Sequence, residues 1–492
     1  MAKIKIISNP YQKMTVFQCW DEALKQWHSI DADSNADSKL LCDELCVGFF
    51  PFKAKKIIDV IVSEYSVNGE KIEVIFEGTD DEYLELYSIC SQDDYSASVT
   101  LSKSGRYLEN ARDILPDVID IFKELSQLVA ESVSDKDKIK RELEKFSDAS
   151  NDVIPICVIG NYSSGKSTFI NALIGYELLP SSDEPTTAKI YKISQSKQPD
   201  RATIKFEYDL KSVRIRFNPD SYKFLTDPEE NLLAVKLSKI LDGIAAEPIP
   251  IKLSKVLETI NGFANHEKDE AISDLIEIET PFDDDGLWGK IWNNFVIFDT
   301  PGSNSASNIK HYQVLQTALE GLSNGLPIFV SEYDSLDSMD NDRLYQDINN
   351  MAELDNRFTM IIVNKADAAS LKKTGLSDDD RDRILNLAIP RQLYSGGIYF
   401  VSSIMGLGSK NDENFIEEHN AEVFEDQKNK YTDSTSRFYK QLYRYNILPA
   451  QIKRKYDMLS ERHKNLLYAN SGLYSVEQAI ETFASIYSHY NK

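Results

Sequence analysis

The sequence lacks any run of eighteen apolar residues, and its start, MAKIKIISNPYQKM, contains no long apolar stretch. These absences predict neither a membrane-spanning helix nor a secretory signal peptide. Positive charge is also scarce, because 55 lysines and arginines stand against 79 aspartates and glutamates and give a formal net charge of −24. This charge argues against broad electrostatic binding to nucleic acid or to anionic membrane surfaces, since both carry the same sign of charge, and it leaves room for a local basic patch.

Cysteine is scarce and scattered. The five cysteines are odd in number, form no CxxC pair and have no nearby histidine that would complete a zinc set: Cys19, Cys42, Cys46, Cys90 and Cys157. This pattern indicates neither a disulfide framework nor a zinc site, and it predicts a reducing, cytoplasmic environment. Apolar residues, by contrast, make up 42% of 492 residues, which is enough to bury the cores of two to four domains.

The first part of the chain predicts two segments. Residues 1–105 are expected to form an accessory α+β module, and two β-rich runs around Asn68-Gly69 predict a hairpin in it. Residues 106–150 carry apolar side chains at helical spacing and predict a helical connector.

The remainder predicts a larger domain followed by helices. Residues 151–410 alternate strand-like and helical stretches, which is typical of a mostly parallel sheet with helices on both faces. A large insertion, about residues 196–285, interrupts this domain with a β-rich run and two amphipathic helical stretches. Residues 411–492 are predicted to be mostly helical.

The stretch GNYSSGKST, residues 160–168, lies between the apolar run PICVI and the helical pattern STFINALI. This order of strand, glycine-bounded loop and helix is what a phosphate-binding loop requires. Gly160 and Gly165 let the backbone wrap around phosphates, Lys166 is expected to reach the β- and γ-phosphates, and Ser167 to ligate Mg²⁺. A glycine-rich turn without a ligand is the disfavoured alternative. The other loop residues expected to contact nucleotide are Asn161, Tyr162, Ser163, Ser164 and Thr168.

Two later strand ends carry further polar motifs. The run NNFVIFDTPG ends in Asp299, which can hold Mg²⁺ through water, and Gly302 can offer its N–H to the γ-phosphate. The run FTMIIVNKAD ends in Asn364, Lys365 and Asp367. A carboxylate there can accept hydrogen bonds from the N1–H and the exocyclic amine of guanine, an arrangement that adenine does not present. Alone, NKAD would be interpreted as a polar turn, but third in order after the two other motifs it predicts a guanine nucleotide.

These motifs resemble the first, third and fourth motifs of GTPases. Ser402 and Ser403, after the run GIYFV, match the fifth, and PTTA offers Thr186 and Thr187 for the second. The phrase GNYSSGKSTFINALIG followed by LLP and PTTA is similar to the dynamin superfamily, especially its bacterial dynamin-like members. The resemblance covers about residues 150–410, and the C-terminal stretch YANSGLYSVEQAIETFASIYSHYNK is similar to the helical stretch after the GTPase domain in bacterial relatives.

The resemblance implies an α/β P-loop GTPase fold that binds GTP or GDP with Mg²⁺ and hydrolyses GTP. It implies catalytic roles for Lys166, for Ser163 at the bridging oxygen and for Thr187 as the switch threonine. Asp367 would specify guanine. The metal ligands that it implies are Ser167, Thr187 and Asp299.

Two positions depart from the family pattern. Tyr162 stands where dynamins often carry a glutamine that orients the attacking water, and Ser303 follows DTPG where many small GTPases have a glutamine. Hydrolysis is therefore expected to depend on backbone groups, on another switch residue, or on a second molecule across a G-domain dimer. His311 is a candidate by position, with a surface histidine as the favoured alternative.

The resemblance leaves three functions open. The first is a bacterial dynamin-like GTPase that forms homodimers through its G domains and remodels membrane, located at the membrane periphery. The second is a cytoplasmic GTP-dependent switch that acts on a protein partner through residues 1–105, and the third is a scaffold that binds nucleotide without hydrolysing it. The nearest candidate for a membrane-binding helix is residues 437–464, but a helical face packing its tyrosines on the G domain is favoured.

Overall fold

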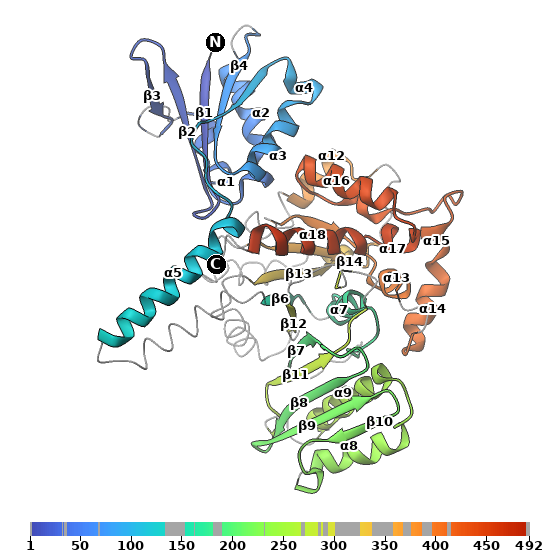
Figure 1. Ribbon diagram of the computed structural model, residues 1–492. Coiled ribbons are helices and arrows are strands. Elements are labelled where there is room, and N and C mark those ends of the chain that lie inside the picture. The colour runs from blue at the N-terminus through green and yellow to red at the C-terminus, as the bar shows by residue number, and fades with distance from the viewer. Residues whose placement is uncertain are drawn as a thin grey trace.

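A computed structural model places the chain around two β-sheets, one small and one large (Figure 1). The described residues are 2–31, 33, 37–66, 69–132, 153–161, 163–180, 189–230, 232–266, 271–283, 287–288, 294–300, 325–336, 358–367, 375–385, 396–410 and 415–488.

The small sheet belongs to the N-terminal part of the chain and has the strand order β3-β2-β1-β4-β5. Its strands are β1 (Lys3–Asn9), β2 (Met14–Asp21), β3 (Gln26–Ser29), β4 (Ile72–Glu77) and β5 (Val99–Lys103). Buried and less buried residues alternate along β1 and β4, as expected for strands with one face on a core. Helices α2 (Ala54–Tyr65) and α3 (Asp80–Cys90) lie along one side of this sheet (Figure 1) and contribute to the same apolar core. The α+β fold class predicted for this module is confirmed.

The hairpin predicted around Asn68-Gly69 is wrong. The run before it lies in α2, and β4 pairs in parallel with β1 and β5. Ile57, Ile58 and Ile61 are buried on one face of α2, so their helical spacing prevails over the β preference of isoleucine. A run rich in β-branched residues is therefore weak evidence for a strand when the same residues can bury one face of a helix in the core.

The large sheet has ten strands in the order β10-β9-β8-β11-β7-β12-β6-β13-β14-β15. The five strands from β12 to β15 in this order are parallel to one another, and β12 pairs antiparallel with β7 on its other side. They are β12 (Asn294–Asp299), β6 (Val153–Ile159), β13 (Leu326–Glu332), β14 (Met360–Asn364) and β15 (Ile398–Phe400). β6, β13 and β14 are buried almost throughout, which is why they read as continuous apolar runs. The predicted mostly parallel sheet flanked by helices is confirmed.

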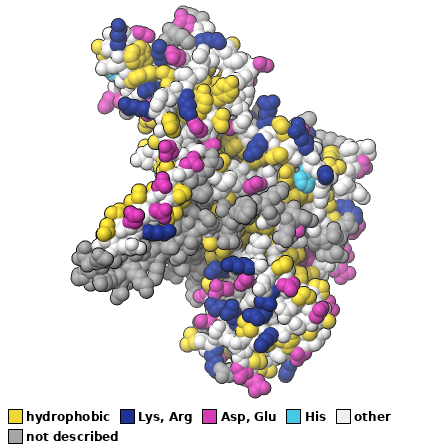
Figure 2. Space-filling model, in the orientation of Figure 1, with side chains coloured by type: hydrophobic (Ala, Val, Ile, Leu, Met, Phe, Trp, Pro, Cys, Tyr) yellow, Lys and Arg dark blue, Asp and Glu magenta, His cyan; other side chains and the backbone are white. Residues whose placement is uncertain are grey.

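The segment that was predicted as an insertion extends this sheet. β7 (Ile190–Gln195) pairs with β12, β11 (Leu275–Thr280) pairs with β7, and antiparallel strands follow at the edge. Those edge strands are β8 (Ala202–Tyr208), β9 (Lys211–Asn218) and β10 (Ser221–Phe224), and the helices of this segment are α8 (Leu232–Gly243) and α9 (Ile249–His266). Figure 2 shows basic side chains gathered over this part of the molecule. In the strands of this region, Lys192 and Lys205 both pair with Glu277, at 3.4 and 2.8 Å.

The C-terminal part is helical and packs its tyrosines inward. Its main elements are α13 (Ser403–Gly408), α14 (Glu418–Gln427), α15 (Asn429–Thr432), η9 (Leu442–Tyr445), α16 (Ala450–Glu461), α17 (Leu466–Asn470) and α18 (Leu473–Ser485). Tyr443, Tyr445 and Tyr456 are buried, which agrees with the favoured interpretation of residues 437–464 as a packed helical face. Helix α5 (Ala111–Ser132) projects from the body in Figure 1. Within the described residues, no helix combines the length and the apolar character needed to cross a bilayer.

Among the described residues, an aromatic cluster and a polar contact join the N-terminal module to the rest of the molecule. The first is an aromatic cluster in which Phe49 and Phe52 meet Phe358 and Tyr487, with ring centroids 4.6 to 6.4 Å apart. Such a buried cluster stabilises the junction through its large apolar area.

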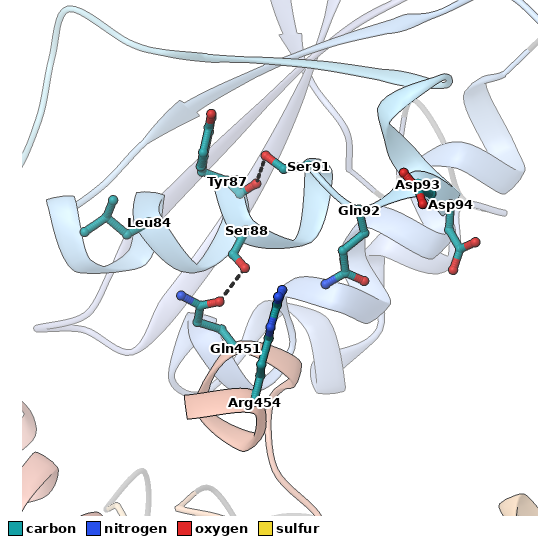
Figure 3. A pocket seen from close by; sticks show the side chains of 9 residues that line it. All are labelled: Leu84, Tyr87, Ser88, Ser91, Gln92, Asp93, Asp94, Gln451 and Arg454. Carbon is teal, nitrogen blue, oxygen red and sulfur yellow. Dashed lines mark hydrogen bonds between the residues drawn. The ribbon is translucent and has the colours of Figure 1, made fainter. Parts of the chain in front are cut away.

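The second contact lies between α3 and α16 (Figure 3). The Ser88 hydroxyl donates a hydrogen bond to Oε1 of Gln451, and the Gln451 N–H points at the buried Glu85 carboxylate, 3.4 Å away. Burial raises the pKa of Glu85 to about 7. A cavity of about 780 Å³ lies beside this contact, lined by Leu84, Tyr87, Ser88, Ser91, Gln92, Asp93, Asp94, Gln451 and Arg454.

Candidate functional site

The loop between β6 and helix α7 (Lys166–Ile174) depends on two glycines for its shape. A Cβ on Gly160 would lie 2.2 Å from the carbonyl oxygen of Val330 in β13, and one on Gly165 would lie 2.3 Å from Nδ2 of Asn364. Gly165 also has a φ of +80°, a conformation that residues with a side chain rarely adopt. The loop is therefore packed tightly against two neighbouring parts of the sheet.

The N-terminus of α7 is open to an acceptor from outside the helix. It begins directly after Gly165, has no side-chain cap, and carries no acidic residue in its first turn. The first N–H groups of a helix lack partners within the helix, and the helix dipole adds positive potential there. Such a terminus is a suitable binding site for a phosphate group.

Lys166, the first residue of this helix, is folded back onto the loop. Its Nζ donates hydrogen bonds to the carbonyl oxygens of Gly160 and Asn161, at 3.0 and 2.9 Å. The side chain is buried, and burial lowers the pKa of Lys166 while the carboxylate of Asp299 opposes that shift. Within the described residues, this ammonium contacts two backbone carbonyls and lies near one carboxylate, an arrangement to which an anion could add opposite charge.

Ser167 and Asp299 meet at the same edge of the sheet. The Ser167 hydroxyl lies 3.4 Å from Oδ2 of Asp299, at the end of β12. Burial raises the pKa of Asp299 to about 6, with Lys166 and Ser167 opposing the rise. Oδ1 of Asp299 is buried and has no hydrogen-bond partner among the described residues. A carboxylate oxygen without a partner beside a hydroxyl fits the oxygen ligands that Mg²⁺ prefers.

Asn364 connects three of the predicted motifs through one side chain. Its Nδ2 donates to the carbonyl oxygens of Ser164 and Gly165, at 3.1 and 3.4 Å. Its Oδ1 accepts hydrogen bonds from the N–H and the hydroxyl of Ser403, at 3.2 and 2.8 Å. Because Asn364 is itself buried, it locks the phosphate-binding loop to the loop after β15.

The rest of the NKAD motif turns sharply after β14. Lys365 has a φ of +51° and its Nζ lies 3.5 Å from a carboxylate oxygen of Glu332. The Ala366 N–H donates to the carbonyl oxygen of Val401 at 3.2 Å, which leaves the half-buried Asp367 at the end of the turn. Ser402 is buried, and its N–H donates to the carbonyl oxygen of Ser471 at 2.9 Å.

The sequence prediction missed two residues that shape this site. The Thr300 hydroxyl donates to the carbonyl oxygen of Val158 at 2.8 Å and so ties the DTPG strand end to β6. Lys440 donates from its Nζ to the carbonyl oxygen of Asp367. Thr300 could have been predicted from its position inside the DTPG motif. Lys440 could not, because no spacing in the sequence links it to NKAD.

Some predicted residues lie outside the described residues. They are Tyr162, Thr186, Thr187, Gly302, Ser303 and His311. Of the remaining loop residues, Ser163 has a φ of +61°, the Ser164 hydroxyl donates to the Asn161 carbonyl oxygen at 2.8 Å, and Thr168 is half-buried in the first turn of α7. The nucleotide and metal roles of all these residues stay predictions.

A family model described as "Dynamin family" matches residues 156–366. A segment of 109 residues is 34% identical to the bacterial dynamin-like protein of Nostoc punctiforme and covers 21% of this chain and 16% of that protein. A segment of 77 residues is 42% identical to dynamin-like protein A of Bacillus subtilis and covers 15% of this chain and 6% of that protein. The chain thus matches far less than two thirds of either relative.

Two solved structures show a general likeness. Both are described as an oligomerised bacterial dynamin pair that provides a mechanism for the long-range sensing and tethering of membranes. Their TM-scores are 0.34 and 0.31 at 16% and 18% sequence identity. The likeness covers 77% and 73% of this chain and 60% and 59% of those chains.

Proposed function

We propose that this chain binds GTP with Mg²⁺ and hydrolyses it, because residues 156–366 match the family model described as "Dynamin family". The observation that carries the proposal is the convergence of Lys166, Asp299 and Asn364 around the open N-terminus of α7. Lys166 comes after β6, and Asp299 and Asn364 are the last residues of β12 and β14. Ligands in open α/β sheets bind outside the carboxyl ends of the strands.

The phosphate side of the proposed site uses groups of opposite charge. Lys166 would exchange its two carbonyl contacts for phosphate oxygens, and the N–H groups at the start of α7 would bind the same phosphates. Ser167 and Asp299 would hold Mg²⁺, with Thr187 as a further ligand. When bound, Mg²⁺ supplies positive charge that neutralises the β- and γ-phosphate oxygens.

The base side of the proposed site lies at the ends of β14 and β15. Asp367 would accept hydrogen bonds from the N1–H and the exocyclic amine of guanine, while Lys365, Ser402 and Ser403 would border the base. Asn364 supports this arrangement because it holds the base loops against the phosphate-binding loop. Guanine recognition and phosphate binding are thus proposed to share one rigid frame.

The output of the GTP cycle is proposed to be dimerisation. Contacts of Thr187 and Gly302 with the γ-phosphate would form only in the GTP state, and the surface that they complete would favour G-domain pairing. In this proposal the pairing is coupled to a change in the flanking helices, with membrane remodelling as the result.

The test is nucleotide binding and turnover by the purified chain. We expect slow, Mg²⁺-dependent hydrolysis of GTP and a clear preference for GTP over ATP in equilibrium binding. Equal affinity for the two nucleotides would refute the role of Asp367. Binding of GTP without any turnover would favour a scaffold that does not hydrolyse it.

A second candidate function is a GTP-dependent switch that acts on a protein partner. One observation favours it: Leu84 and Tyr87 are 58% and 55% exposed beside the cavity between α3 and α16. Exposed apolar side chains at the rim of a cavity are typical of contact sites for another molecule. Sedimentation with liposomes, combined with a size measurement in each nucleotide state, separates the two functions. Pelleting with lipid favours membrane remodelling, and GTP-dependent dimers that ignore lipid favour the switch.

A further inference from the structure

Asp367, the last residue of the NKAD motif, is held by a lysine that lies far away in sequence. Nζ of Lys440 donates a hydrogen bond to the backbone carbonyl oxygen of Asp367, across 73 residues of chain. Lys440 stands outside residues 156–366, the part that matches the family model. The contact therefore comes from the C-terminal helical part of the chain.

Each residue of the motif has a different anchor. Asn364 is fixed by the phosphate-binding loop and Ser403, and Ala366 by the carbonyl oxygen of Val401. Lys440 anchors the residue whose carboxylate is proposed to contact the base. A carboxylate at the end of a turn needs such an anchor, because recognition of two donors requires a defined position and orientation.

The charge of Lys440 also acts on Asp367. Burial lowers the pKa of Lys440, the carboxylate of Asp367 raises it, and Lys430 lowers it. The Lys440 ammonium therefore lies within the electrostatic field of the Asp367 carboxylate. The ionised carboxylate is the form that accepts two hydrogen bonds from guanine.

Lys440 is in turn held in place by its surroundings. Its backbone N–H donates to the carbonyl oxygen of Lys430 at 2.8 Å, and Nδ2 of Asn470 donates to the carbonyl oxygen of Tyr431 at 2.7 Å. Tyr431 is fully buried, and burial raises the pKa of its hydroxyl. The Asp367 carboxylate adds to that rise, so Tyr431 lies within the electrostatic field of the carboxylate near Lys440.

The same part of the chain supports the second base loop. Oδ1 of Asn446 accepts a hydrogen bond from the Phe400 N–H at 2.9 Å, and the N–H of Ile398 donates to the carbonyl oxygen of Ile447 at 3.1 Å. These bonds hold β15, the strand that leads to Ser402. The C-terminal segment thus supports both loops of the proposed base site.

We propose that Lys440 is a positioning residue for guanine recognition, which holds Asp367 where its carboxylate meets the exocyclic amine of the base. The proposal rests on the guanine-binding role given to Asp367 under the proposed function. It assigns a part of base specificity to the helical segment that follows the nucleotide-binding motifs.

The test compares GTP with inosine triphosphate, which keeps the phosphates, the ribose and the N1–H but lacks the exocyclic amine. The wild-type chain is expected to prefer GTP by about 10- to 100-fold, the worth of one charge-assisted hydrogen bond. In Lys440→Met this preference is expected to fall by about 3- to 10-fold, mainly through weaker GTP binding. Lys440→Arg, which keeps the charge and the donor, is expected to stay within about twofold of wild type.

Lys455→Met removes an exposed lysine of α16 and serves as the matched control. An equal loss of affinity for both nucleotides in Lys440→Met would overturn the inference, because a general structural role weakens both. If Lys440→Met lowers the melting temperature, Lys440→Ala is measured in its place, and a preference like that of wild type contradicts the inference. A wild-type chain that binds GTP, inosine triphosphate and ATP equally would refute the assignment of Asp367 itself.

Discussion

The two sheets each contain a strand, a turn and a helix in succession, but the helices begin with opposite chemistry. In the large sheet, β6 leads through a glycine-bounded loop into α7, whose N-terminus has no side-chain cap and no acid in its first turn. In the small sheet, β4 leads into α3, where Thr79 and Glu82 form a capping box and three acids occupy the first turn. The first helix end can accept an anion, whereas the second has its donors occupied and repels one.

The buried carboxylates show the same difference. Both oxygens of Glu82 are occupied, by the Ser8 hydroxyl at 2.7 Å and by the N–H and hydroxyl of Thr79 at 3.1 and 3.2 Å. Oδ1 of Asp299 has no partner in the described part of the chain. Burial raises the pKa of both groups. A shifted pKa therefore does not by itself mark a functional site.

The largest expected effect is on the affinity for GTP, when Lys166 at the N-terminus of α7 is replaced. Lys166→Ala should lower the affinity for GTP by about 100-fold or more, because the phosphates lose a charge-assisted contact in a buried site. Isothermal titration with GTP and Mg²⁺ measures the change, with the exposed Lys239→Ala on α8 as the control. Retained binding would show that the glycine loop has only a structural role.

The next effect concerns Asp299, whose Oδ1 has no partner among the described residues, and the pH dependence of Mg²⁺ binding. Asp299 is ionised above a pKa of about 6 and protonated below it, so the gain in GTP affinity from Mg²⁺ should fall as the pH drops from 7 to 5. Asp299→Asn should lose about 10-fold or more of that gain at pH 7.5 and show no such pH dependence. Titration of a fluorescent GTP analogue with Mg²⁺ or EDTA measures both. A wild-type profile that is flat across this range contradicts the assignment.

Replacing Glu82, whose two carboxylate oxygens both accept hydrogen bonds, should lower stability and leave nucleotide binding unchanged. Glu82→Ala leaves three donors without their acceptor and should lower the free energy of unfolding by about 2–3 kcal/mol. Urea denaturation followed by tryptophan fluorescence, to which Trp20 and Trp27 of the small sheet contribute, measures the loss. The exposed Glu422→Ala of α14 is the control. A weaker affinity for GTP in a folded Glu82→Ala chain would argue against separate roles for the two sheets.

The smallest effect is the loss of the cap on α3. Thr79→Ala removes the hydroxyl that accepts from the Glu82 N–H and should cost about 1 kcal/mol of stability. The same urea experiment measures it, beside Thr100→Ala at an exposed position of β5. An equal loss in both variants would show that the cap contributes nothing beyond the general cost of the substitution.

Much of the large sheet and of the glycine-bounded loop after β6 could be predicted from local sequence. Continuous apolar runs predict buried parallel strands, and the glycine-bounded loop before Lys166 predicts its own shape. The small sheet was harder, because the isoleucines of α2 favour a strand by type and a helix by spacing, and only the core decides between them. Tyr162, Thr187 and Gly302 lie outside the described residues, so their roles stay predictions.

The sequence by itself determined which chemistry this chain carries: a cation, a hydroxyl and two carboxylates at strand ends, in the order of the GTPase motifs. The tertiary structure decided which of these groups meet and what holds them. Asn364 contacts the phosphate-binding loop across 199 and 200 residues, and Lys440 contacts Asp367 across 73. Periodicity and spacing report on neighbours within one element, whereas contacts between distant elements arise only when packing brings them together.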